Sequence, residues 1–186
     1  MKKLFSFVIA LCVCFLAAGQ SSLPPVDKSP MDMSYYPVNY PVLKIQDKAT
    51  EPLVARVIYS RPKKESRTIF GGLVEYGKVW RLGANEATEI EFFQKVNIAG
   101  KKIPKGRYTL YAIVNENSWT FIVNKETDTW GSFKYNQEKD IVHADALVEK
   151  LTDPVESMVM TFEKAGNNFS LVVAWENVKV ALPINL

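Results

Sequence analysis

The sequence has only two cysteines, a single histidine and no long apolar run beyond its N-terminal segment. Cys12 and Cys14 both lie in that segment, so a chain that has lost it has no disulfide, no thiol nucleophile and no thiolate metal site. With His143 as the one imidazole, a zinc site lacks its usual ligands, and we expect no metal. The chain also has no phosphate-cradling glycine loop and no dinucleotide fingerprint, so we expect no cofactor.

An excess of charge of one sign is also missing. The chain has 23 lysines and arginines against 20 aspartates and glutamates. No basic block with interleaved aromatic residues occurs, so nucleic acid is not an expected partner. No segment after the N-terminal one approaches the length of a membrane-spanning helix, and we expect no transmembrane segment once the N-terminal one is removed.

Residues 1–19 have the pattern of a secretory signal peptide. Lys2 and Lys3 precede an apolar run that extends to Leu16, and small residues follow it. This run is too short to anchor a membrane-spanning helix, and we place the cleavage after Gly19. The pattern predicts a periplasmic or secreted protein.

Residues 20–42 are predicted to form a proline-rich extended leader, followed by one domain over residues 43–186. Proline fixes the backbone dihedral φ and disfavours helix, so an extended and partly ordered segment is expected. Two alternatives stay open, because the leader can be docked on the domain by its tyrosines or can be a flexible tether. Its prolines are Pro24, Pro25, Pro30, Pro37 and Pro41.

The domain is predicted to be all-β, as a single antiparallel β-sandwich with a jelly-roll-like arrangement. Apolar and polar residues alternate along most of it, as in the strand opened by Tyr108, Leu110 and Ala112. Nine or ten short strands separated by turn residues are typical of such folds. Only residues 140–151 have a composition that would also suit a helix.

Residues 59–88 are predicted to carry the functional site, because this stretch is irregular and rich in arginine, glycine and aromatic residues. Its arginines are planar cations suited to a carboxylate or phosphate, and its aromatic side chains offer flat surfaces for stacking. Asn85 and Glu86 come just before a strand, where polar side chains can converge on a pocket. The candidate ligand-binding residues are Arg61, Arg67, Tyr76, Trp80, Arg81, Asn85 and Glu86.

A purely structural interpretation of the same residues carries about equal weight. The arginines can bond backbone carbonyls, Trp80 can fill the core, and residues 83–86 can be a simple turn. The loop with Trp130, Phe133 and Tyr135 can rim a pocket or plug one end of the sandwich, the second being somewhat favoured. We interpret His143 as a surface residue.

Several motifs of this chain occur together in one known family. They are Tyr-x-Arg-Pro at 59–62, Arg-x-Ile-Phe-Gly-Gly-Leu-Val at 67–74, Tyr-Gly-Lys-Val-Trp-Arg-x-Gly-Ala-Asn-Glu-Ala-Thr at 76–88, Lys-x-x-Pro-x-Gly-x-Tyr at 101–108, Asn-Lys at 124–125, Trp-Gly at 130–131 and Ala-Trp-Glu-Asn at 174–177. This set resembles the bacterial DUF2911 family. Glu75 and the pair Glu65-Ser66 depart from its usual pattern. The resemblance implies an exported single-domain protein of unknown function and transfers no catalytic residue.

Three functions are compatible with these observations. The first is an exported small-ligand binding module of the cell envelope without catalysis, whose ligand is anionic, carbohydrate-like or an extended peptide. The second is a cell-envelope hydrolase or isomerase with Glu86 as the candidate general base, tuned by Arg67 or Arg81. The third is a structural or assembly partner that binds another envelope protein through sheet edges or the leader.

Overall fold

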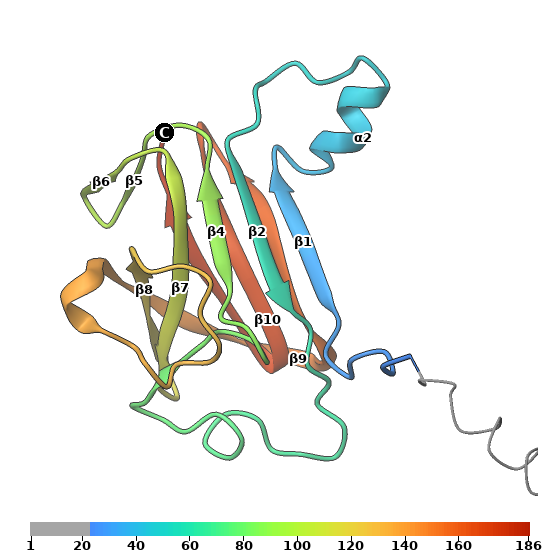
Figure 1. The fold of residues 1–186 in the computed structure, drawn as a ribbon, viewed down its shortest axis with the longest axis vertical. Coiled ribbons are helices and arrows are strands. Elements are labelled where there is room, and N and C mark those ends of the chain that lie inside the picture. Colours follow the sequence, from blue (N-terminus) through green and yellow to red (C-terminus); the bar gives the residue numbers. More distant parts are fainter. Residues whose placement is uncertain (1–22) are drawn as a thin grey trace, which may run out of the picture.

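The computed structural model describes residues 23–186, and the signal peptide predicted over residues 1–19 lies outside them. The described chain is almost entirely antiparallel strand, which confirms the all-β prediction (Figure 1). Its elements are β1 (Met31–Tyr36), α2 (Tyr40–Ile45), β2 (Ala55–Ser60), β3 (Val79–Trp80), β4 (Glu89–Phe92), β5 (Val96–Ile98), β6 (Lys101–Ile103), β7 (Gly106–Val114), β8 (Ser118–Asn124), the 3-10 helix η1 (Gln137–Lys139), β9 (Asp140–Ala165) and β10 (Asn168–Ile184).

One curled sheet forms both layers of the molecule. Its strand order is β1-β2-β4-β7-β8-β9-β10, with β3 beside β7, while β5 and β6 form a separate hairpin. The start of β9 pairs with β8, and the rest of β9 pairs with β10. The long strand β9 therefore belongs to both layers, and β10 lies behind β2 and β4 in the view of Figure 1. The layers meet again at β1 and β2, where Ser34 and Tyr59 both donate hydrogen bonds to the Met160 carbonyl, at 2.7 and 3.2 Å.

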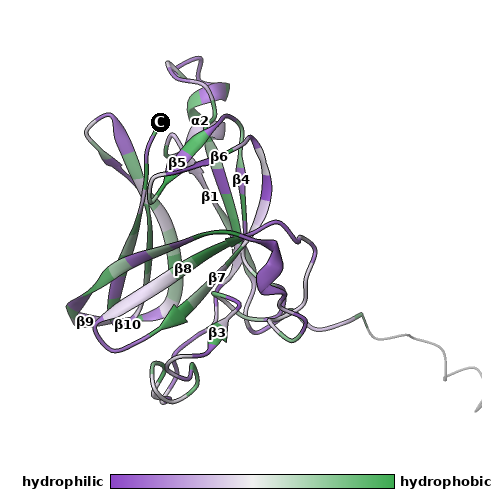
Figure 2. Ribbon diagram, turned by 90° about the vertical axis from the view of Figure 1, so that its left-hand side faces the viewer, coloured by the Kyte–Doolittle hydropathy of each residue, from purple (hydrophilic) through white to green (hydrophobic). Residues whose placement is uncertain are grey.

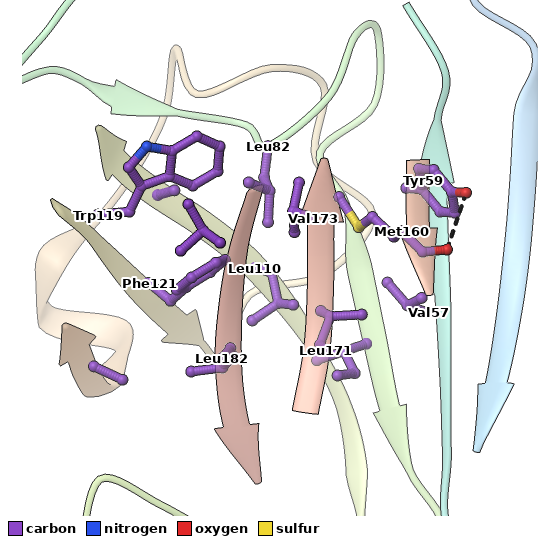
Figure 3. Close-up of a cluster of buried hydrophobic side chains, with 14 of the residues drawn as sticks. Val57, Tyr59, Leu82, Leu110, Trp119, Phe121, Met160, Leu171, Val173 and Leu182 are labelled. Atoms are coloured by element: carbon purple, nitrogen blue, oxygen red, sulfur yellow. Dashed lines mark hydrogen bonds between the residues drawn. The ribbon is translucent and has the colours of Figure 1, made fainter. Parts of the chain in front are cut away.

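The core fills the space between the two layers. Leu110 and Ala112 of β7 belong to this core, as their alternation predicted. Leu110 points into it together with Leu171 and Val173 of β10 (Figure 3). All four side chains are fully buried. Hydrophobic residues are concentrated along β7, β8 and the adjoining strands (Figure 2). Burial of this kind is the main source of stability in a chain without disulfides.

Part of the predicted leader packs on the domain. Residues 31–36 are extended, as expected, and form the edge strand β1, docked by Tyr36, whose ring stacks on Phe169 with centroids 4.0 Å apart. The short helix α2 then departs from the prediction that the prolines disfavour helix here. Pro41 lies in its first turn, where a backbone N–H would have no acceptor within the helix, so the lack of an N–H in proline costs nothing there. Residue 43, the expected domain boundary, therefore falls within α2.

Residues 140–151, whose composition also suited a helix, belong to β9. Their alternation places one face against the core and the other toward solvent, which decides the conformation in favour of strand. Within residues 23–186 no helix has the length and apolar character required to cross a membrane.

Candidate functional site

The irregular connection after β2 is anchored on an aromatic cluster at one end of the fold. The ring of Phe70 lies 5.2 Å from that of Trp119 and about 6 Å from those of Trp80 and Trp175, at 6.2 and 6.1 Å. Trp80 is only 8% exposed, and its indole N–H donates to the Gly83 carbonyl at 3.1 Å. Trp80 therefore fills the core and offers no free face for stacking on a ligand.

Arg61 and Arg67 use their guanidinium groups to tie backbone segments together. The Nε of Arg61 donates to the Met158 carbonyl at 3.0 Å, and its Nη1 lies 3.2 Å from an Asp32 carboxylate oxygen. The guanidinium of Arg67 donates to the carbonyls of Lys63 and Lys64, within its own loop. Both arginines have the bracing role that was the structural alternative to ligand binding.

Arg81 has a different environment. Its side chain is half-buried, and within residues 23–186 its Nε atom is buried without a hydrogen-bond partner. Burial lowers the pKa of its guanidinium. The cavities described below are lined by none of the three arginines.

Tyr76 and Asn85 support the local backbone. Tyr76 packs over Gly71, whose φ is +83° and where an added Cβ would lie 2.8 Å from the tyrosine ring. Asn85 has a positive φ of 57°, and its carbonyl accepts the Gly131 N–H at 2.9 Å. Tyr76 thus covers the turn at Gly71, and Asn85 belongs to the scaffold next to the first pocket described below, which Gly131 lines.

Glu86 is the predicted site residue that lies on a cavity. It is exposed, and its backbone forms an antiparallel bridge with Trp130. The next residue, Ala87, donates its N–H to the Thr129 carbonyl at 3.0 Å. Residues 85–87 and 129–131, which belong to two separate motifs of the sequence, therefore lie side by side.

The second of these segments belongs to the β8–β9 loop, residues 125–139, which is closed at its base by Asn124. The Asn124 side chain is 1% exposed. Its Nδ2 donates to the Asn136 carbonyl at 3.0 Å and to Asp140 Oδ1 at 2.7 Å, and its Oδ1 accepts the Glu126 N–H at 2.9 Å. One buried amide thus holds both ends of the loop.

The middle of the loop packs on the outer face of the sheet. Tyr111 and Ile122 are buried there together with Ala87, and the ring of Tyr135 meets that of Tyr111 edge-on at 5.2 Å. The Tyr135 hydroxyl donates to Asp140, and burial followed by this contact raises the pKa of Tyr135.

His143 also contacts this aspartate. Its Nε2 lies 2.8 Å from Asp140 Oδ2. The His143 side chain is exposed, so it is a surface residue, as interpreted from the sequence, but one bonded to a carboxylate that is only 8% exposed.

The loop encloses a cavity of about 490 Å³, here named the aromatic pocket. Trp130 and Phe133 stand on its rim and are 62% and 82% exposed. Of the two alternatives for this loop, the structure favours the pocket, since Trp130 and Phe133 rim it, whereas Tyr135 packs on the outer face of the sheet and does not plug one end of the sandwich. The lining residues are Tyr111, Glu126, Thr127, Asp128, Thr129, Trp130, Gly131, Phe133 and Lys134.

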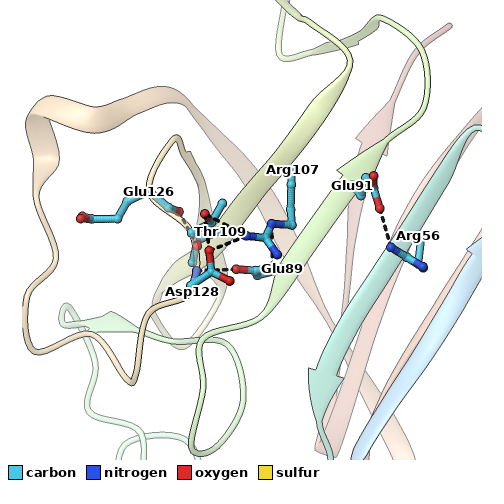
Figure 4. Close-up of polar contacts among 8 residues, drawn as sticks. Arg56, Glu89, Glu91, Arg107, Thr109, Glu126 and Asp128 are labelled. Atoms are coloured by element: carbon cyan, nitrogen blue, oxygen red, sulfur yellow. Dashed lines mark hydrogen bonds and ion pairs between the residues drawn. The ribbon is translucent and has the colours of Figure 1, made fainter.

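A second cavity of about 220 Å³, here named the acidic pocket, shares the wall formed by Asp128 and Thr129. Arg107 pairs with the Asp128 carboxylate and lies 3.4 Å from that of Glu89 (Figure 4). Among residues 23–186 the Glu86 carboxylate has no such ion pair. The lining residues are Met31, Ile58, Glu86, Ala87, Glu89, Asp128 and Thr129.

The linings of the two pockets carry mainly acidic side chains, most of which are paired with basic residues. Glu86, Glu89, Glu126 and Asp128 contribute carboxylates, and Lys134 is the one basic residue on either lining. Arg107 pairs with Glu89 and Asp128, and Lys139 pairs with Glu126 at 2.8 Å. Within the described part of the chain no group of three His, Cys, Asp or Glu side chains is placed to hold a metal ion. The site can therefore supply aromatic surfaces and hydrogen-bond acceptors.

The fold and the site together define an all-β protein with a two-part surface pocket on the outer face of a curled sheet. The model of the DUF2911 family, described as a protein of unknown function, matches residues 43–184, and the chain belongs to this family. The resemblance read from the motifs is thereby confirmed. No match was found among curated proteins or among solved structures.

Proposed function

We propose that the protein is an exported, non-catalytic module of the cell envelope that binds a carbohydrate-like ligand in the aromatic pocket. The observation that carries the proposal is the pair Trp130 and Phe133, both exposed on the rim of one cavity. Large aromatic side chains held in solvent at a concave surface are typical of ligand sites, and flat rings suit the apolar faces of sugars.

The polar groups of the pocket suit a hydroxylated ligand. Carboxylates accept hydrogen bonds from hydroxyl groups. The pocket carries Glu126 and Asp128, which are paired with Lys139 and Arg107, and Lys134 is the one basic residue on its lining, so it has no cluster of cations that would select an anion. The arginines that would have favoured an anion, Arg61 and Arg67, are bonded to backbone carbonyls.

The N-terminal sequence supports the exported location. Lys2 and Lys3, the apolar run and the small residues up to Gly19 form the pattern of a cleaved signal. We propose the periplasm or the cell exterior as the place of action, where glycans of the envelope are accessible.

A thermal-shift screen against an array of soluble glycans tests the proposal. A ligand that binds only the folded state raises the melting temperature, and the stabilisation grows with the logarithm of its concentration over its dissociation constant. We expect at least one glycan to stabilise the wild type and Trp130→Ala to lose that stabilisation. Leu147→Ala is the matched control, because Leu147 is 82% exposed and lines neither pocket. Equal stabilisation of both variants would contradict the proposed site.

A hydrolase acting on the same class of ligand is the second candidate. It is favoured by the position of Glu86, whose carboxylate shares the acidic pocket with those of Glu89 and Asp128. Incubating the bound glycan with the protein and separating the products by chromatography tests it. Cleavage that Glu86→Gln abolishes would support catalysis, whereas an unchanged glycan supports binding alone.

A further inference from the structure

The aromatic pocket and the acidic pocket adjoin along one line on the outer face of the sheet. Asp128 and Thr129 line both cavities and form the ridge between them. The aromatic pocket reaches β7 through Tyr111, and the acidic pocket continues over Ile58 of β2 to Met31 of β1. A ligand that passes over the ridge would therefore contact both pockets.

The ridge is fixed by bonds on both sides. Thr129 accepts the Ala87 N–H at 3.0 Å through its carbonyl, and its Oγ1 lies 3.2 Å from the Tyr111 hydroxyl. Asp128 donates its N–H to Glu89 Oε1 at 2.7 Å, and its carboxylate pairs with Arg107 (Figure 4). A ridge held in this way keeps the two cavities at a constant separation, which lowers the cost of binding a ligand that spans them.

The sizes of the cavities indicate that they hold parts of one ligand. Pockets for complete small ligands usually measure about 300 to 1,000 Å³. The aromatic pocket reaches this range at about 490 Å³, but the acidic pocket, at about 220 Å³, does not. The acidic pocket is therefore suited to one further unit of a ligand that is anchored next door.

The chemistry of the acidic pocket selects that unit. Ile58, Met31 and Ala87 give it an apolar lining, on which the C–H face of a sugar ring can lie. Arg107 neutralises part of the charge of Glu89 and Asp128, but the Glu86 carboxylate makes no ion pair within residues 23–186. Glu86 can thus accept a hydrogen bond from a hydroxyl or an amino group, and it disfavours a carboxylate.

We infer that the ligand is an oligosaccharide of at least two units, neutral or amino-bearing, which crosses the Asp128–Thr129 ridge. One ring contacts Trp130 and Phe133, and the next ring lies over Ile58 with a donor group on Glu86. This inference rests on the proposed function, since it assigns the second ring only if the first is a sugar. Acidic glycans are excluded by the carboxylates of the second pocket.

Titration calorimetry with glycan series of one to four units tests the inference. Suitable probes are N-acetylglucosamine and its β-linked oligomers, the corresponding deacetylated oligomers, cello-oligomers and oligogalacturonides. Because the second ring binds as part of an attached ligand, we expect affinity to rise at least about tenfold from one to two units in a neutral or amino series. Oligogalacturonides should bind at least about tenfold more weakly than neutral oligomers of equal length.

Two variants separate the second pocket from the first. Glu86→Ala removes the acceptor, and Met31→Asn removes apolar lining at an exposed edge-strand position without adding charge. In each variant, the affinity for a two-unit glycan should exceed that for the one-unit glycan by less than about threefold. The second variant provides the test if the first does not fold. Glu116→Ala, at an exposed turn that lines neither pocket, should keep the full gain.

The possible results are distinct. A length-dependent gain that both variants reduce supports the two-unit ligand. If monosaccharide and oligomers bind the wild type equally, the inference is overturned and the proposed function remains. If no glycan of any series binds, the proposed function is overturned, and the inference falls with it.

Discussion

The Nδ2 atom of Asn124 donates a hydrogen bond to Oδ1 of Asp140 at 2.7 Å, joining the last residue of β8 to the first residue of β9. This bond closes the neck of the β8–β9 loop, which carries Trp130 and Phe133. The position of the proposed aromatic rim therefore depends on one buried amide that contacts no ligand itself.

Replacing this amide should loosen the loop. Asn124→Ala leaves the Asp140 carboxylate and the Glu126 N–H each without one partner, and an unsatisfied buried polar group costs about 1–3 kcal/mol. We expect a loss of that size in urea-induced unfolding, together with faster amide hydrogen exchange over residues 125–139. Asn167→Ala, in the exposed turn between β9 and β10, is the matched control. Unchanged exchange in the loop would show that Asn124 does not hold it.

The stability of the fold should fall at alkaline pH. Burial, together with the Asp140 contact, raises the pKa of Tyr135 above its usual value, and burial also raises the pKa of Tyr111 and Tyr59. Below about pH 10 these hydroxyls are protonated in both states, and the full stability is present. Above it the unfolded chain loses its protons first, so the free energy of unfolding decreases toward the raised folded pKa.

Tyr135→Phe isolates one part of this effect. The variant has no proton to lose at this position, so its stability should decline less steeply between pH 9 and 11 than that of the wild type. Urea unfolding followed by tryptophan fluorescence at several pH values measures the slope. Tyr40→Phe is the control, because Tyr40 lies in α2, outside the β8–β9 loop. Equal slopes for wild type and Tyr135→Phe would rule out this contribution.

Replacement of two phenylalanines by alanine should affect the stability of the fold very differently. Phe70 is buried in the aromatic cluster, and Phe→Ala changes in a core cost about 3–5 kcal/mol. Phe133 is 82% exposed, so Phe133→Ala should change stability by less than about 0.5 kcal/mol. On the proposed function, Phe133→Ala should still reduce the stabilisation by a glycan. Thermal unfolding with and without that glycan measures both effects, and a strong loss of stability in Phe133→Ala would place its ring in the core instead.

The sequence predicted strands best where apolar and polar residues alternate. In β4 the buried Ile90 and Phe92 alternate with the partly exposed Glu89 and Glu91, and this pattern can be recognised without any knowledge of the partner strands. The continuity of β9 could not be predicted, since Pro154 and its polar neighbours resemble a turn. In the structure Pro154 precedes Val155, which pairs with Glu176 between two shifts of the β9–β10 register. Proline is tolerated at such an irregular point of the hydrogen-bond ladder, so β9 continues through it.

The site was only partly predictable for a related reason. The sequence singled out both Glu86 and Trp130, but it could not show that they are neighbours. Their antiparallel bridge joins two segments that lack the alternation of apolar and polar residues from which strand pairing is predicted. The aromatic loop had one useful signal, two large apolar residues in a polar stretch. The bonds of Arg61 and Arg67 could not be predicted, because a guanidinium binds a backbone carbonyl as well as an anion, and the sequence does not show which of these lies within reach.

A variant of Arg81 tests whether this residue binds the ligand, as the sequence suggested, or is a buried residue outside the site, as the structure indicates. If it bound the ligand, Arg81→Met would abolish stabilisation by a glycan. The structure instead buries its Nε without a partner within residues 23–186 and lowers its pKa through burial. Replacing a poorly partnered buried N–H by an apolar group of similar length should leave stability unchanged or raise it by about 1 kcal/mol.

The comparison with Arg61→Met makes this test specific. Arg61 bonds the Met158 carbonyl and pairs with Asp32, so its replacement should lower the free energy of unfolding by about 1 kcal/mol. Both variants should keep the glycan-induced shift of the melting temperature, because neither residue lines the aromatic or the acidic pocket. Loss of that shift in Arg81→Met, with folding intact, would move the site from the β8–β9 loop to the connection after β2.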